Sequence, residues 1–387
     1  MDQQGLDIML VCSKRNVSYF SGWFQHLGSY WEIDDYGRPE IFFVGVPKDR
    51  NKSDFLICNS MFEIMDMYSY RDSYIRDRYY YGTYESVLDT MTSAGKIYDN
   101  PIDCVVQALK DRNLDRSCIG VEMDYASHAS DIFSMYIHDR LRKALPDVTF
   151  RDASQPICQL RMIKSREEIE RIRRAAEASE CAVKTAFESL REGMTEIEFE
   201  KTIKKTSADR YSDYCMSHVV FNPSKYLACG KNICWATETK LHPGDVVWVD
   251  LVAGYRNYVS DMCRSKAFPR PNADVDRINK ALIDTNEKLR DMIRPGLKCS
   301  DIFNFGNKLV EKSGCSLSLK TVGHGIGVSI HEPPYLNSAN HTLLEPDMVL
   351  ALELMAEKEG LVIGLEDDIL ITAEGNEPIT NLDRRIA

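Results

Sequence analysis

The sequence predicts a two-domain chain of mixed α+β class, and three observations lead to this prediction. At 387 residues the chain is long enough for two domains, each with its own core. In the first half, short apolar runs alternate with helical patterns. In the second half, four runs that carry acidic residues are expected to pair as two hairpins, with helices around them. We place the boundary near residue 157, so the domains span 1–157 and 158–387.

The first domain is expected to contain short strands that alternate with helices. Continuous apolar runs predict four buried strands, at 7–12, 40–46, 54–58 and 118–122. Apolar residues recur at helical spacing in two further segments, 105–112 and 132–145. This alternation is typical of a small α/β domain.

Four helices are predicted in the second domain from their start and stop signals. The Ser/Thr-x-x-Glu spacing of a capping box begins two of them, at 165–168 and 195–198. The first of these helices is expected to run to Gly193. A third is predicted at 275–293, and Ser300 is expected to cap a fourth.

Two pairs of carboxylates flank the turns of the predicted hairpins and are expected to face each other directly: Asp250 with Asp261, and Glu353 with Glu366. These pairings follow from turns centred on 255–256 and on 359–360. Directly opposed residues on one face of a ladder have Cβ atoms about 4.5–5.5 Å apart, where like charges repel. A cation between the carboxylates would remove this repulsion.

A histidine in a glycine-rich run completes the candidate site. His324 lies in Gly-His-Gly-Ile-Gly at 323–327. Solvated strand charges remain the alternative for either carboxylate pair alone, but both pairs together with His324 favour a site for two divalent ions. Carboxylate oxygens and one imidazole suit Mn²⁺, Fe²⁺, Co²⁺ or Zn²⁺. Two such ions about 3.5–4 Å apart can bridge a hydroxide and polarise a carbonyl.

Composition disfavours several partners and compartments. The chain has 48 basic and 59 acidic residues, and its net charge of −11 disfavours nucleic acid and anionic membranes as partners. Its 12 cysteines form no Cys-x-x-Cys, and no segment resembles a signal peptide or an apolar membrane span. A reduced cytoplasm is therefore the expected compartment, rather than the disulfide-forming environment of a secreted protein.

Several segments match a known family in order along the chain. Residues 5–23 resemble the opening of a creatinase-type amino-terminal domain, and 160–169 resemble its junction with a catalytic domain. Runs 244–250, 323–333 and 365–372 resemble the catalytic signature of the pita-bread family, which contains creatinase, prolidase, aminopeptidase P and methionine aminopeptidase. The resemblance implies a pita-bread catalytic domain after a smaller α/β creatinase-type domain, and it implies a homodimer.

The resemblance also assigns roles to residues, position by position. It implies five metal ligands, namely Asp250, Asp261, His324, Glu353 and Glu366. It implies that Glu353 is in addition the general base for the bridging hydroxide. His331, seven residues after His324, would bind the substrate carbonyl or the tetrahedral intermediate. Taken alone, a histidine such as His331 is more often an ordinary polar residue.

Two departures from the family pattern concern the substrate. Proline-specific members have another histidine upstream of the first aspartate, but Ile-Cys-Trp stands there, at 233–235. His218 is the nearest substitute for binding substrate, with a structural role as the alternative. Prolidases commonly have His-Arg-Thr-Gly-His where this chain has Lys-Thr-Val-Gly-His, at 320–324. The ammonium of Lys320 therefore either replaces the group that holds a substrate carboxylate or faces solvent.

The aromatic segment 23–32 is a further candidate for substrate binding. Trp23 and Trp31, with the aromatic side chains between them, could line a pocket for a small cationic ligand through cation–π contacts. Core or dimer-interface packing is the alternative.

Three functions compete at this stage. The first is a metal-dependent Xaa-Pro dipeptidase or aminopeptidase, favoured by the complete ligand set. The second is a small-molecule enzyme of the same fold, either a creatinase- or ectoine-hydrolase-like C–N hydrolase or a lyase similar to the dimethylsulfoniopropionate lyases, favoured by the missing histidine. The third is a binding protein without catalysis, which has no use for opposed carboxylates.

Overall fold

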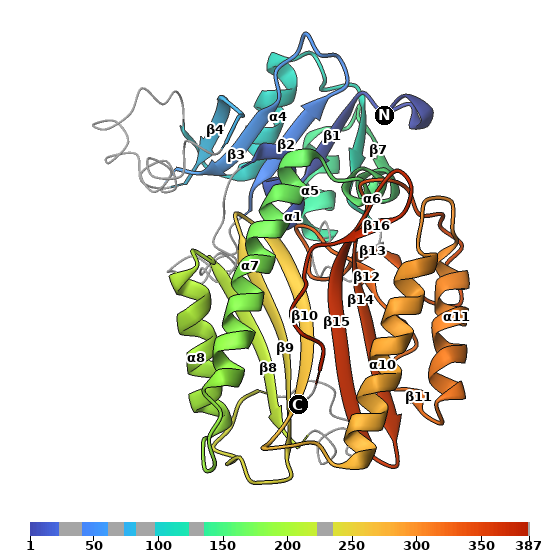
Figure 1. Cartoon of the computed structure of the whole chain (residues 1–387). Helices are drawn as coiled ribbons and strands as arrows, with labels where there is room; N and C mark the ends of the chain where they lie inside the picture. Colours follow the sequence, from blue (N-terminus) through green and yellow to red (C-terminus); the bar gives the residue numbers. More distant parts are fainter. Residues whose placement is uncertain (23–40, 61–72, 83–96, 124–134, 223–234, 386–387) are drawn as a thin grey trace. The chain divides into compact units, whose positions relative to one another are not determined.

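The computed structural model describes residues 1–22, 41–60, 73–82, 97–123, 135–222 and 235–385 (Figure 1). These residues form two compact units, Met1–Leu160 and Arg161–Ala387. Both units combine helices with sheets, so the predicted α+β class with two domains is confirmed. Trp23 and Trp31 lie outside the described residues.

The first unit is built on one seven-stranded sheet with the order β5-β4-β3-β2-β1-β6-β7. The strands are β1 (Ile8–Val11), β2 (Phe43–Pro47), β3 (Phe55–Asn59), β4 (Asp77–Tyr81), β5 (Ile97–Tyr98), β6 (Cys118–Val121) and β7 (Thr149–Asp152). The central strand β1 pairs antiparallel with β2 and parallel with β6. The four predicted strands correspond to β1, β2, β3 and β6.

Helices cover both faces of this sheet because its strands alternate in the side chains they present. In β1, Ile8 and Leu10 belong to one core cluster, whereas Met9 and Val11 belong to another. The first cluster includes apolar residues of α4 (Pro101–Asp111) and α5 (Met135–Ala144). The second includes residues of α1 (Lys14–Ser21) and α6 (Ser154–Met162).

Two sheets form the centre of the second unit. The first has the order β10-β9-β8, with β8 (Tyr214–Phe221), β9 (Val246–Tyr255) and β10 (Tyr258–Ala267). The second has the order β13-β12-β14-β15-β16, with β11 (Ser316–Leu317) also paired to β14. Its strands are β12 (His324–Gly325), β13 (Glu332–Tyr335), β14 (Val349–Lys358), β15 (Leu361–Ile371) and β16 (Asn376–Pro378). The sheets adjoin where β10 runs beside β15 (Figure 1).

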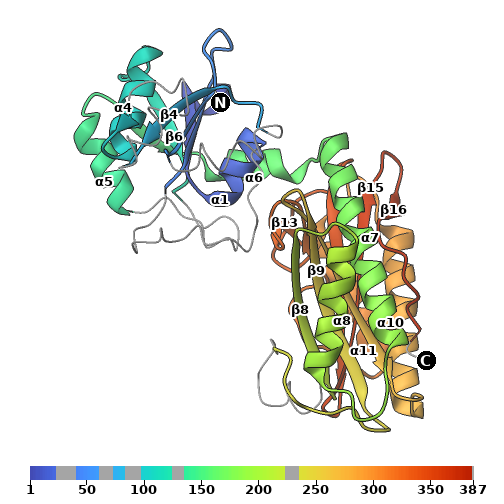
Figure 2. The same ribbon diagram turned by 90° about the vertical axis from the view of Figure 1, so that its left-hand side faces the viewer.

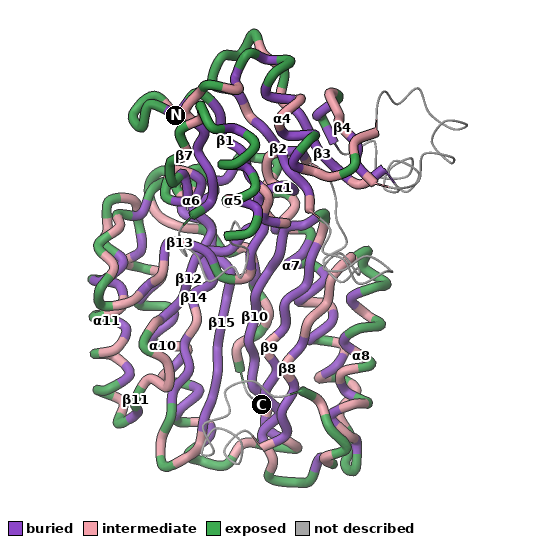
Figure 3. The backbone as a smooth tube through the Cα atoms, turned by 180° about the vertical axis from the view of Figure 1, so that it is seen from behind, coloured by how far each residue is buried: buried purple, intermediate pink, exposed green. Residues whose placement is uncertain are grey.

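Four helices pack on these sheets: α7 (Arg166–Glu188), α8 (Glu196–Asp209), α10 (Ala273–Met292) and α11 (Cys299–Lys312). Helix α7 packs against β9 and β10, α8 against β8, and α10 against β14 and β15 (Figures 1 and 2). Most residues of β10 and β15 are buried, as the colouring of these two strands in Figure 3 shows. Among the described residues, no helix is both long enough and apolar enough to cross a membrane.

The helix starts test the predicted caps. Both capping boxes are present, at the beginnings of α7 and α8. The predicted cap at Ser300 is wrong, because Lys298 is the N-cap of α11 and Ser300 lies inside the helix. Backbone carbonyls of Asn340 and Thr342 accept the N–H groups of Ser300 and Cys299, so the first turn needs no side-chain cap. Helix α7 ends at Glu188, before the predicted Gly193.

The hairpin of β14 and β15 has the predicted register. Glu353 pairs directly with Glu366, and the turn consists of Glu359 and Gly360. Both turn residues have positive φ angles, 52° and 81°, as a type I′ turn requires. The two glutamates therefore share one face of the ladder at neighbouring positions.

The hairpin of β9 and β10 has a register that differs from the prediction. Tyr255 pairs with Tyr258, so the turn is formed by 256–257, one residue later than expected, and both residues have positive φ angles. Asp250 consequently pairs with Cys263, and the expected direct pairing of Asp250 with Asp261 is wrong. The offset of two residues is even, so both aspartates still face the same way as diagonal neighbours, typically about 7–8 Å apart.

Candidate metal centre

The five predicted ligands come from five strands of the second unit. Asp250 lies on β9 and Asp261 on β10, while His324, Glu353 and Glu366 lie on β12, β14 and β15. The adjoining edges of the two sheets bring these side chains together, because β10 packs on β15 and β12 pairs with β14. Each hairpin supplies only two of these ligands, so the site forms only when the two sheets come together.

Ligand atoms of these residues fall into three overlapping groups, each with all atoms within 4.8 Å of one another: Asp261, His324 and His331; His324, Glu353 and Glu366; Asp250, Asp261 and Glu366. All five predicted ligands appear in at least one group. The Nε2 atom of His324 lies 3.6 Å from Oε1 of Glu366 and 3.9 Å from Oδ2 of Asp261. The side chains thus converge on a common space.

Burial and mutual repulsion shift the carboxyl groups of this centre in one direction. Burial raises the pKa of Glu353 to about 8, and the charge of Asp250 adds to the effect. Burial, followed by repulsion from the neighbouring carboxylates, raises the pKa values of Asp261 and Glu366 well above their ordinary range. Burial also raises the pKa of Asp250, against an opposing effect of His218. Such a cluster is costly to ionise unless cations enter it.

The residues present fit a pair of divalent cations. Oδ1 of Asp261 and Oε1 of Glu366 are buried and accept no hydrogen bond from any described residue. Buried carboxylate oxygens of this kind need a partner, and a metal ion supplies one. Four carboxylates carry four negative charges when ionised, which two divalent ions would balance. Oxygen donors with one imidazole are also the ligand types that Mn²⁺, Fe²⁺, Co²⁺ and Zn²⁺ accept.

Asp368 supports the centre from behind Asp261. Its carboxylate accepts hydrogen bonds from the hydroxyl of Ser260 at 2.6 Å and from the backbone N–H of Asp261 at 3.2 Å. Strand alternation explains its position, because residues 366 and 368 of β15 face the same way. Sequence reasoning missed this role, although the run Glu-Asp-Asp at 366–368 inside an apolar strand was a signal for it.

The middle residue of that run faces the other way and meets arginines. Asp367 is fully buried and accepts hydrogen bonds from Arg264 at 2.5 Å and Arg384 at 2.6 Å. Burial alone would raise the pKa of Asp367, but the two guanidinium groups outweigh it and lower the pKa. Arg264 also donates to the carbonyl of Glu366 at 2.6 Å. It therefore fixes the backbone of β15 beside a predicted ligand.

Two of the predicted substrate residues lie at the centre. The imidazole of His331 is exposed, and its ring centroid is 4.3 Å from that of His324. His218 on β8 pairs directly with Asp250 on β9. Its Nδ1 atom is buried without a hydrogen-bond partner among the described residues, and its ring meets the exposed indole of Trp235.

The remaining predicted substrate residues, Lys320, Trp23 and Trp31, stay predictions. Lys320 is exposed. Trp23 and Trp31 fall outside the described residues.

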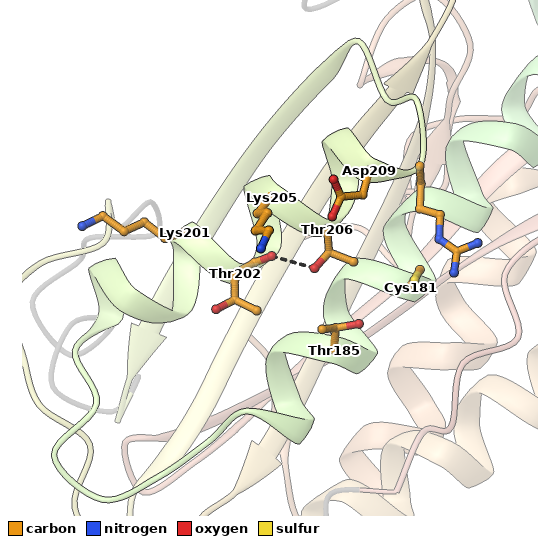
Figure 4. Close-up of a pocket in the computed structure, with 8 residues that line it drawn as sticks. Cys181, Thr185, Lys201, Thr202, Lys205, Thr206 and Asp209 are labelled. Atoms are coloured by element: carbon orange, nitrogen blue, oxygen red, sulfur yellow. Dashed lines mark hydrogen bonds between the residues drawn. The ribbon is translucent and has the colours of Figure 1, made fainter.

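An open cavity of about 560 Å³ lies elsewhere, between α7 and α8 (Figure 4). Its lining combines cations with threonines and one thiol: Cys181, Thr185, Lys201, Thr202, Lys205, Thr206, Asp209 and Arg210. None of the predicted site residues lines it. The hydroxyl of Thr206 is already bonded to the carbonyl of Thr202. We assign no role to this cavity.

Two family models match the chain, one in each half. The model of metallopeptidase family M24 matches residues 170–373, which is more than half of the chain, and the model of the creatinase/prolidase N-terminal domain matches residues 1–163. An uncharacterized peptidase of Staphylococcus aureus (strain bovine RF122 / ET3-1) is 31% identical over 242 residues, which cover 61% of this chain and 67% of that protein.

Two solved structures share the fold over the whole chain. The X-Pro aminopeptidase of Thermotoga maritima MSB8 is 22% identical, covers 100% of this chain and 96% of its own, and has a TM-score of 0.78. The Xaa-Pro dipeptidase of Bacillus anthracis is 21% identical, with the same coverage and TM-score. The predicted pita-bread fold after a creatinase-type domain is thereby confirmed. The chain belongs to metallopeptidase family M24 and is a metal-dependent peptidase of that family.

Proposed function

We propose that this chain hydrolyses the amide bond next to proline, in Xaa-Pro dipeptides or at the amino end of longer Xaa-Pro peptides, with two divalent metal ions as its cofactor. The observation that carries the proposal is the convergence of four carboxylates and His324, including two buried oxygens without a hydrogen-bond partner among the described residues. The structural neighbours support the preference for proline, since their titles describe X-Pro and Xaa-Pro peptidases.

Metal ions held by Asp250, Asp261, His324, Glu353 and Glu366 would polarise the scissile carbonyl and lower the pKa of the attacking water. In this mechanism the carboxylate of Glu353 takes the proton from that water and passes it to the leaving amine. A general base works best with a pKa near the working pH, and burial moves the pKa of Glu353 in that direction before any ion is bound.

Two histidines are proposed to hold the substrate. His331 is exposed beside the centre, where its imidazole can donate a hydrogen bond to the substrate carbonyl oxygen as negative charge develops there. His218 faces the same centre from β8 and offers a buried nitrogen to the substrate. Lys320, Trp23 and Trp31 stay predictions, as do a homodimer and a cytoplasmic location.

The aromatic wall beside His218 favours a second candidate function. Trp235 is 64% exposed and its ring lies 5.4 Å from that of His218. An exposed indole at the edge of a metal centre suits a small or cationic substrate as well as a prolyl ring. The second candidate is therefore hydrolysis of a C–N bond in a small molecule by the same centre, with lyase chemistry as its variant.

A metal-reconstitution assay tests the proposed function. The protein would be stripped with a chelator, reloaded with Mn²⁺ or Co²⁺, checked for bound metal by elemental analysis, and assayed on matched Xaa-Pro and Xaa-Ala peptides. We expect turnover of the Xaa-Pro substrates only in the reloaded protein. Glu353→Gln should lower kcat by about 10²–10⁴-fold, the usual contribution of a general base.

Two results decide between the candidates. A metal-loaded protein that leaves every Xaa-Pro peptide intact would overturn the peptidase proposal. Hydrolysis of small amides by the same preparation, lost in Glu353→Gln, would establish the second candidate in its place. A protein that retains no metal after reloading contradicts both.

A further inference from the structure

The loop that connects His324 to His331 ends on a buried ion cluster. Glu332, the residue after His331, is 2% exposed and forms ion pairs with Arg161 and Lys164. Nζ of Lys164 donates to Oε1 of Glu332 at 2.8 Å, and Arg161 also donates to the hydroxyl of Ser329 at 2.6 Å. All three charged side chains are at most 5% exposed.

This cluster is expensive for the protein to maintain. Two cations and one anion are removed from water, and buried ion pairs seldom stabilise a fold more than apolar residues of the same size would. Burial alone would raise the pKa of Glu332, but Lys164 and Arg161 outweigh that effect and lower the pKa. Because the cluster adds little to the stability of the fold, its presence favours a role in positioning the loop.

Further contacts tie the same loop to the ligand strands. A Cβ atom at Gly327 would lie 2.5 Å from Oε1 of Glu332, so a larger residue there would displace the ion-paired carboxylate. The carbonyl of Gly327 accepts from the N–H of Val259 on β10 at 2.9 Å. The N–H of Lys164 donates to the carbonyl of Asp347, just before β14, at 2.9 Å. The cluster thus links the loop to the strands of Asp261 and Glu353.

His331 itself has little burial to hold it in place. Its side chain is exposed, whereas its neighbour Glu332 is buried and bonded to two cations. One of its ring nitrogens nevertheless lies within 4.8 Å of ligand atoms of Asp261 and His324. The backbone of the loop therefore contributes to the position of this exposed side chain.

We propose that Arg161, Lys164 and Glu332 are positioning residues that hold the imidazole of His331 at the metal centre. They act through the backbone of loop 326–332. The proposal rests on the proposed function only for the role of His331 toward the substrate. The position of His331 can be measured without it.

A double-mutant cycle separates positioning from general stability. Lys164→Met keeps the length of the side chain, removes one cation and leaves Glu332 paired with Arg161. We expect it to lower kcat about 10-fold on the best Xaa-Pro substrate with little change in KM. In a His331→Ala background, the same substitution should lower kcat no further, because the group that it positions is gone. Lys164→Arg should restore most of the activity.

Two variants serve as controls for this cycle. Lys201→Met removes an exposed lysine from α8, far from the loop in sequence, and should change neither kcat nor KM. Glu332→Gln removes the anion from the cluster and should lower kcat in the same non-additive way. If Lys164→Met and His331→Ala lower kcat by independent factors that multiply, the cluster does not act through His331 and the proposal is overturned.

A second measurement needs no activity. The chain has eight histidines, so the imidazole signals of ¹⁵N-histidine-labelled, metal-free protein can be assigned by NMR, with His331→Ala identifying the signal of His331. We expect Lys164→Met and Glu332→Gln to shift or broaden that signal, and Lys201→Met to leave it unchanged. An unaltered His331 signal in both cluster variants overturns the proposal. Altered signals in a protein without Xaa-Pro activity would support the positioning role while the proposed function fails.

Discussion

Asp368 is the residue whose contribution to the metal centre is easiest to isolate, because its carboxylate holds a ligand strand by the backbone. It accepts hydrogen bonds from Ser260 and from the N–H of Asp261. Partners of this kind orient a ligand and tune its charge. Its negative charge also contributes to the raised pKa of Asp261.

Replacing this carboxylate with an amide is expected to weaken metal binding. Asp368→Asn keeps the shape of the side chain but loses one acceptor and one charge, so the affinity for Mn²⁺ should fall about 10–100-fold. Competition with a chelating fluorophore measures this affinity. Asp274→Asn, at an exposed position on α10, is the matched control and should bind Mn²⁺ like the wild type. Equal affinities in the two variants would contradict the role given to Asp368.

At the residue scale, the ligands were predictable and their supports were not. Asp250, Asp261, Glu353 and Glu366 stand out because charged residues are rare in apolar strands, and His324 stands out because glycines flank it. Asp367 and Asp368 stand in the same strand, but their roles depend on side chains from β10 that no local pattern connects to them. The distance between such partners along the sequence, about 100 residues, hides the contact.

At the element scale, the tight turns set the positions of the carboxylates. The turn between β14 and β15 places Glu359 at a φ angle of 52°, which a glutamate adopts at some cost. Asn-Gly is the favoured pair for a type I′ turn. The side chain of Glu359 is exposed, so its replacement removes no packing.

Two substitutions in this turn should have opposite effects on stability. Glu359→Asn is expected to raise the free energy of unfolding by roughly 0.5 kcal/mol, because asparagine tolerates the left-handed conformation better. Glu359→Val should lower it by about 1 kcal/mol or more, since a β-branched residue is strained there. Urea unfolding of the metal-loaded protein measures both. If valine is tolerated as well as asparagine, the turn does not control the stability of this hairpin.

The two hairpins show why register is harder to predict than strand identity. In the hairpin of β14 and β15, a glycine marks the second turn residue and the prediction was correct. In the hairpin of β9 and β10, the left-handed residues are Arg256 and Asn257, and arginine gives no turn signal at its position. The prediction relied on the nearby Gly254 and therefore placed the turn one residue too early. The face of the sheet on which the two aspartates lie was still predicted correctly, because a register shift of two residues does not change it.

At the scale of the whole molecule, the buried carboxyl groups couple stability to pH and metal. The pKa of Glu353 rises from an ordinary 4.5 to about 8 in the metal-free fold, and those of Asp250, Asp261 and Glu366 rise too. The folded state therefore retains protons that the unfolded chain releases. The contribution of each such group to the free energy of unfolding is fully present below about pH 4.5. It is lost progressively as the pH rises toward 8.

We therefore expect the metal-free protein to lose stability between pH 4.5 and pH 8, by about 1.4 kcal/mol per pH unit for each proton retained. Metal-loaded protein should show a much flatter dependence, because bound cations replace those protons. Calorimetry of both forms across this range measures the difference. Glu353→Gln removes one ionisation, so metal-free Glu353→Gln should be more stable than the metal-free wild type at pH 8. A metal-free wild type that is most stable at pH 8 would contradict this account.

The division into two units was predictable, although several strands at the margins of the first sheet were not. β4 carries the polar and aromatic run Asp-Arg-Tyr-Tyr-Tyr, and β7 is largely exposed. Such strands lie toward the ends of the sheet order, where one face or one edge meets solvent and apolar periodicity fades. Central strands such as β1 are apolar on both faces and were recognised readily.

The ion cluster at Glu332 also determines where a shorter fragment containing the catalytic half can begin. The family model begins at residue 170, so a fragment designed on that boundary would discard Arg161 and Lys164 while keeping Glu332. A carboxylate would then be left in the interior with both of its cations removed, a defect worth about 3–5 kcal/mol in comparable cases. The physical start of the catalytic half is therefore Arg161, nine residues before the start of the family match.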